Sequence, residues 1–107
     1  MTMFQRLKHD LRAGWATVRY GTAQAATRAL EETELLRLRL DVRKLDERIR
    51  DLCRDLGERA MTLHEQGDSL DRIAADLEVM RMLREIEALK SQREQKQTDM
   101  AEVRAGE

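Results

Sequence analysis

Apolar residues recur at alternating spacings of three and four positions through the middle of the chain. The series starts at Leu35 and keeps its register beyond Leu56, and charged residues fill most of the positions between its members. Such spacing places apolar side chains along one face of an α-helix and is typical of a heptad seam. The predicted seam consists of Leu35, Leu38, Val42, Leu45, Ile49, Leu52, Leu56, Ala60 and Leu63.

A glycine interrupts this pattern in the stretch TLHEQGDSLDRI, residues 62–73. Gly67 can adopt the left-handed conformation that ends a helix, and both Asp68 and Ser69 after it are good N-caps. With Asp68 as the cap, Asp71 lies at the third helical position, where a carboxylate suits the positive end of the helix. This stretch therefore predicts a turn at residues 67–68 between two helices.

A second apolar face follows the turn. Its predicted members are Leu70, Ile73, Leu77, Met80, Leu83, Ile86 and Leu89, with Ala74, Val79 and Met82 beside them. Beyond Lys90 the pattern thins, because Arg93 and Lys96 occupy positions that apolar residues would take in a longer stripe. Met100 and Val103 are isolated, so we expect the strongest packing near the turn.

A tight loop of this kind makes neighbouring helices antiparallel. Counting outward from the loop predicts these opposed pairs: Leu56 with Val79, Leu52 with Leu83, Ile49 with Ile86, and Leu45 with Leu89 or Lys90. We therefore expect an all-α chain, a long antiparallel helical hairpin with coiled-coil packing and an N-terminal amphipathic helical extension. Residues 31–66 form its first arm and residues 69–104 its second.

The first 30 residues carry a different amphipathic face. Five basic residues and one acidic residue give residues 1–30 a net charge of +4, whereas residues 31–107 carry −5. On a helical wheel one face holds Phe4, Leu7, Leu11, Gly14, Trp15, Val18, Thr22, Ala25 and Ala29, and Lys8, Arg12 and Arg19 border it. No proline or clear cap separates this segment from the seam, so we expect one helix from about residue 3 to residue 65.

Leu36 and Leu40 continue the N-terminal stripe onto the side of the helix that is roughly opposite the seam. A hairpin of two helices covers the seam only. A residual apolar stripe of this kind usually packs against another helix.

Composition agrees with long helices. Charged residues make up 38% of the chain and aromatic residues 3%, there is no proline, and Cys53 is the single cysteine. No internal disulfide can form, which favours a reducing compartment. No apolar stretch reaches the roughly 20 residues of a membrane span, and no signal-peptide pattern follows the start. We expect a cytoplasmic protein, with attachment to the inner face of a membrane as the alternative.

The sequence offers no pattern for catalysis or for a cofactor. HExxH, CxxC, GxGxxG and the P-loop pattern are absent, and His9 and His64 lie far apart along the chain. Carboxylates alternate with arginines, as they do on solvated helix faces. We therefore predict no catalytic, cofactor-binding or metal-binding residues, no small-molecule substrate and no nucleic-acid partner.

The function predicted from these patterns is that of a non-enzymatic coiled-coil interaction or structural protein, which associates with itself or docks another helical protein. The alternative is a peripheral protein that binds an anionic membrane or lipid surface through its basic N-terminal helix. A third class, which the sequence favours less, is a chaperone or adaptor that holds a client helix.

Overall fold

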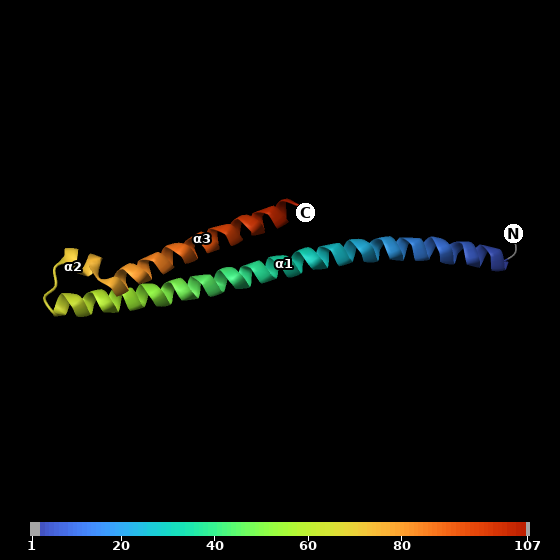
Figure 1. Ribbon diagram of the computed structural model, residues 1–107. Helices are drawn as coiled ribbons and strands as arrows, with labels where there is room; N and C mark the ends of the chain where they lie inside the picture. The colour runs from blue at the N-terminus through green and yellow to red at the C-terminus, as the bar shows by residue number, and fades with distance from the viewer. Residues whose placement is uncertain (1–2, 107) are drawn as a thin grey trace. The chain divides into compact units, whose positions relative to one another are not determined.

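The computed structural model describes the backbone of residues 3–106 and the side chains of residues 23–106. It contains α1 (Met3–Glu65), α2 (Leu70–Ala75) and α3 (Leu77–Ala105), and no strand occurs in this described part (Figure 1). The contacts divide the chain into two units, residues 1–35 and residues 36–107. The first unit belongs to α1 alone, and the second is an all-α helical hairpin.

The hairpin pairs residues 36–65 of α1 with α3, which runs in the opposite direction beside it (Figure 1). At about 1.5 Å per residue each arm is roughly 45 Å long. The arms match in length, so apolar side chains can meet over most of the hairpin. α1 has the bounds of about 3 to 65 that the sequence predicts.

The turn is built on Gly67, whose φ of 89° lies in the left-handed region that glycine tolerates best. The Gly67 N–H donates to the carbonyl oxygen of His64 at 3.0 Å, and the Asp68 N–H donates to that of Leu63 at 3.1 Å. These two bonds form a Schellman motif, which satisfies carbonyl groups left open at the end of α1.

The structure decides between the two candidate caps of the second helix. Ser69, not Asp68, is the N-cap of α2, and its side chain accepts a hydrogen bond from the Arg72 N–H at 3.3 Å. The carbonyl oxygen of Ser69 also accepts a backbone hydrogen bond of α2, from the Ile73 N–H at 3.0 Å. Asp71 then lies one position earlier in the helix than predicted.

The second arm is also not one helix. Asp76 has φ −61° and ψ 133°, an extended conformation that ends α2 and begins α3. Its side chain accepts a hydrogen bond from the Val79 N–H at 3.1 Å, so Asp76 is the N-cap of α3. Two helices that meet at an extended residue do not share one helical phase, and the apolar face counted from Leu70 therefore does not continue into α3.

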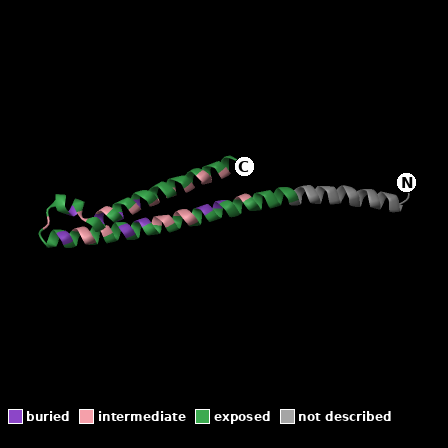
Figure 2. Ribbon diagram, in the orientation of Figure 1, coloured by how far each residue is buried: buried purple, intermediate pink, exposed green. Residues whose placement is uncertain are grey.

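Two apolar clusters hold the half of the hairpin nearest the turn. The first contains Ile49, Leu52, Met82 and Ile86, with Leu56 and Leu89 against it; the second contains Leu63, Ile73 and Val79, with Leu56 and Ala60 against it. We call this region, residues 47–63 with residues 73–87, the turn half. Figure 2 shows the buried positions along the facing sides of the helices.

The register of α3 differs from the predicted register. Val79 and Met82 are buried, whereas Leu77 and Leu83 are exposed and Met80 is half-buried. Met82 takes the place beside Leu52 that the sequence assigned to Leu83. Two predicted pairs do pack together: Ile49 and Ile86 belong to the first cluster, and Leu56 packs against the second cluster, which contains Val79.

The seam of α3 continues beyond the residues of the two apolar clusters. One series of buried and half-buried positions alternates by three and four from Val79 to Val103: Val79, Met82, Ile86, Leu89, Arg93, Lys96, Met100 and Val103. Two members of this series are charged, and the half-buried residues Met80, Glu85 and Asp99 lie beside it. We call residues 36–46 with residues 88–105 the open half of the hairpin; on its α1 side Leu38 is buried, and Val42 and Leu45 are half-buried. Leu35, in the first unit, is buried as well.

Candidate interaction surface

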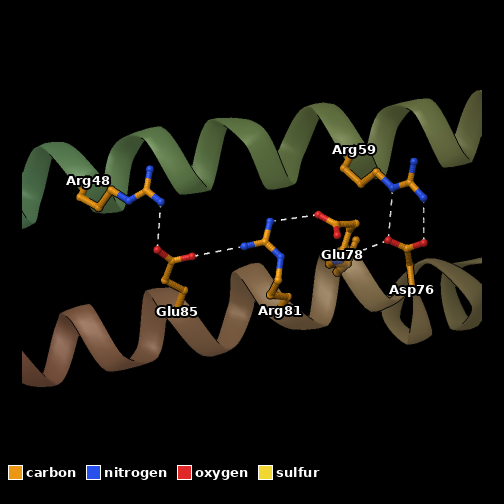
Figure 3. A network of polar contacts seen from close by, with 7 residues as sticks. Arg48, Arg59, Asp76, Glu78, Arg81 and Glu85 are labelled. Carbon is orange, nitrogen blue, oxygen red and sulfur yellow. Dashed lines mark hydrogen bonds and ion pairs between the residues drawn. The ribbon is translucent and has the colours of Figure 1, made fainter.

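A bidentate ion pair fixes the break between α2 and α3 to α1. The Arg59 guanidinium donates to both carboxylate oxygens of Asp76, at 3.0 and 3.2 Å (Figure 3). The hydrogen bond from Arg59 is the main cause that lowers the pKa of the Asp76 carboxyl, and the same bond raises the pKa of Arg59. Asp76 thereby acts as a helix cap and as a cross-helix anchor at once.

A second run of charges extends from this point along the turn half. Arg81 contacts Glu78 at 3.0 Å and Glu85 at 3.6 Å, and Glu85 accepts from Arg48 of α1 at 2.9 Å (Figure 3). The hydrogen bond to Glu78 is the first cause of the raised pKa of Arg81. These groups are exposed or half-exposed, so they align the two arms more than they stabilise them.

Two further ion pairs cross the open half. Arg93 donates to Asp46 at 2.9 Å, and Lys96 lies 3.6 Å from Asp41. Arg93 and Lys96 hold seam positions of α3, and all four side chains are about one third exposed. Two of the five seam positions of α3 in the open half are therefore charged, whereas the seam positions of α3 in the turn half are all apolar.

Leu36 and Leu40 remain on the outside of the hairpin. Leu36 is 55% exposed and Leu40 48%, on the side of α1 opposite the buried seam residue Leu38. Around them lie the exposed cations Arg37, Arg39, Arg43, Lys44 and Arg50. We call these two leucines and five cations the basic arm face.

Leu70 and Leu77 are still more exposed, at 80% and 83%. Each is the first residue of its helix, and each is followed by an exposed carboxylate, Asp71 or Glu78. We call these four residues the leucine tip. Neither leucine belongs to the core that the sequence predicted for them, and no sequence signal separates them from core leucines until the break at Asp76 is known.

The predicted partner face of the N-terminal helix lies outside the residues with described side chains. This applies to Phe4, Leu7, Lys8, Leu11, Arg12, Gly14, Trp15, Val18 and Arg19. In the described part of the first unit, Ala25, Ala29 and Leu30 are exposed.

Residues 23–106 offer no group of three or more His, Cys, Asp or Glu side chains that could hold a metal ion. Cys53 is exposed and forms no disulfide. Among the described residues, no helix has both the length and the apolar character needed to span a bilayer.

Comparisons with models of protein families, with curated proteins and with solved structures find no match to this chain.

Proposed function

We propose that this chain is a non-enzymatic interaction protein: a helical hairpin, packed as an antiparallel coiled coil, that associates with further copies of itself. The observation that carries the proposal is the exposure of Leu36 and Leu40 on the outer side of the same helix that supplies the seam. A hairpin can bury one stripe of each arm. This second stripe is removed from water only if another chain covers it.

Four of the exposed leucines lie next to charged side chains in the sequence: Leu36 and Leu40 on the outer side of α1, and Leu70 and Leu77 at the starts of α2 and α3. Apolar groups rimmed by charge are typical of protein–protein contacts. Self-association also offsets the modest apolar burial of an isolated helical pair, whose stability is marginal.

The test is the mass of the full chain in solution. Sedimentation velocity from low to high micromolar concentration should show the average mass rising with concentration, and the Leu36→Glu/Leu40→Glu variant should reduce this rise. The matched control is Gln92→Glu/Gln97→Glu, which adds the same two charges to exposed positions of α3. A wild-type chain that stays monomeric throughout this range would refute the proposal.

The lipid-surface function remains a prediction of the N-terminal sequence. Flotation with anionic liposomes at low salt should recover the chain if that function is correct, and Trp15→Glu should abolish the recovery. The hairpin-based proposal does not depend on the result, because its surfaces lie in residues 36–107.

A further inference from the structure

We propose that copies of the chain associate head to tail, with the leucine tip of one copy docked on the basic arm face of the next. This inference rests on the proposed self-association and gives its geometry. Both surfaces belong to residues 36–107, so every copy carries one of each.

The charges of the two surfaces are opposite. Residues 58–78, which surround the tip, contain six carboxylates and two guanidinium groups, a net charge of −4 with His64 neutral. Residues 36–50 of α1 contain six basic and three acidic side chains, a net charge of +3. Like surfaces would therefore repel each other, and unlike surfaces attract.

Four of the five cations of the arm face are available for such a contact, whereas Arg43 lies 3.5 Å from Glu47. Asp41 and Asp46 turn toward α3, where they pair with Lys96 and Arg93. Within the described residues, no ion pair engages Arg37, Arg39, Lys44 or Arg50. The carboxylate of Asp71 at the tip is likewise exposed.

The apolar parts of the two surfaces also match. Each presents two leucines that are about half exposed or more. A shallow depression, open to solvent, lies on the arm and is lined by Arg39, Val42, Arg43, Asp46, Glu47 and Arg50. A leucine of the tip that enters it would meet the Val42 side chain, and the arginines around it would meet the carboxylates that follow Leu70 and Leu77.

One copy cannot make this contact with itself. Leu56 and Val79 pack in the same cluster, so Leu77 lies about level with residue 58 of α1. Leu40 is then 18 residues farther along the arm, roughly 27 Å away at 1.5 Å per residue. Contact between two different surfaces on separate copies is heterologous, and it produces open chains or closed rings rather than a dimer with a two-fold axis.

The experiment uses two full-length variants that each block one surface with a repulsive charge. The arm-blocked chain is Leu36→Glu/Leu40→Glu, and the tip-blocked chain is Leu70→Lys/Leu77→Lys. All four leucines are exposed, so both variants should fold, and thermal melts followed by circular dichroism verify this. The Leu→Ser pair at each surface, which removes apolar contact without adding charge, replaces either variant that melts early.

Each blocked variant alone should be monomeric at concentrations where wild type associates, with an association constant reduced by about tenfold or more. The mixing experiment uses the Leu→Ser pairs, because the Glu-blocked arm and the Lys-blocked tip would attract each other. An equimolar mixture of the two Leu→Ser chains should form a 1:1 complex and nothing larger, because only the native tip of one chain and the native arm of the other can meet. Sedimentation velocity measures both results.

Three outcomes would overturn the inference. If the tip-blocked chain associates like wild type while the arm-blocked chain does not, the arms pair with each other: self-association stands and the head-to-tail geometry falls. If neither block matters, other surfaces carry the assembly. If wild type itself is monomeric, the proposed function fails together with its geometry.

Discussion

The turn half and the open half of the hairpin join the same two helices by different means. In the turn half, Ile49 and Leu52 of α1 pack on Met82 and Ile86 of α3, and Leu52 is only 3% exposed. In the open half two of the seam positions of α3 are occupied by Arg93 and Lys96, which pair with Asp46 and Asp41. A heptad pattern can therefore continue through charged residues, provided that the opposite arm supplies the counter-charges at the correct level.

The difference has an energetic consequence. Full burial of a leucine or isoleucine side chain stabilises a fold by about 1.5–3 kcal/mol, whereas a surface ion pair contributes about 0–1 kcal/mol and is screened by salt. The turn half should therefore hold the hairpin together. The open half should contribute alignment, because each ion pair is satisfied in one register only.

The largest expected effect is that of a charge in the turn half. Ile49→Asp places an unpaired carboxylate in the apolar cluster, which should cost more than about 3 kcal/mol and unfold the hairpin at 25 °C. Circular dichroism and thermal melting measure this. The control is Leu40→Asp on the outer side of α1, which should leave the melting curve of the monomer nearly unchanged. An unaltered melt of Ile49→Asp would mean that the seam is not a core.

A milder pair of substitutions compares the halves directly. Leu52→Ala removes a buried side chain and should lower the free energy of unfolding by about 2–4 kcal/mol. Leu45→Ala acts on a half-buried side chain next to the ion pairs and should cost about 1 kcal/mol. Urea titration of both variants gives the difference. Equal losses would show that the two halves are packed alike.

An apolar substitution at a charged seam position of the open half should raise the free energy of unfolding, in contrast to the substitutions above, which lower it. Lys96→Leu adds one apolar residue to the seam of α3 at the cost of one exposed ion pair, so the free energy of unfolding should rise by up to about 1 kcal/mol. The matched control is Lys90→Leu, at an exposed position outside the seam, which should have little effect. A loss of stability in Lys96→Leu, greater than in the control, would assign the ion pair a larger role than surface charges usually have.

The smallest effect concerns pH. Arg59 holds the pKa of the folded Asp76 carboxyl below its ordinary value of 3.8. The stabilisation that follows is therefore fully present above that ordinary value, and it is lost as the pH falls through the lower pKa of the folded state. Asp76→Asn keeps a capping side chain but removes the charge, so its melting temperature should fall less than that of wild type on acidification below about pH 4. Parallel acid slopes for the two chains would exclude a contribution from this pair.

Much of the hairpin could be predicted from its sequence, because the α1 seam consists of aliphatic residues in a single unbroken helix. The turn could also be predicted, because glycine tolerates a positive φ better than other residues and Gly67 adopts one. The register of α3 could not be predicted so simply. Leu70, Ile73, Leu77 and Met80 have helical spacing in the sequence, and one capping residue, Asp76, separates them into two helices of different phase.

The leucine tip follows from that same break. Leu77 becomes a tip residue instead of a core residue because α3 begins there. The sequence already placed Arg93 and Lys96 at stripe positions, but it did not show that Asp46 and Asp41 of the opposite arm pair with them. The spacing of three and four runs unbroken through both residues once Val79 is taken as the first seam position.

The central claim is that α3 folds back along α1 into the open half within one molecule. The most direct measurement is the distance between spin labels at Glu47→Cys and Lys90→Cys, two exposed positions, in a Cys53→Ser background diluted with unlabelled chain. Packed helices lie about 8–10 Å apart, so the account predicts one narrow distance below roughly 30 Å at low salt. A distribution centred near 65 Å, the length of 43 residues of continuous helix at about 1.5 Å each, would contradict it.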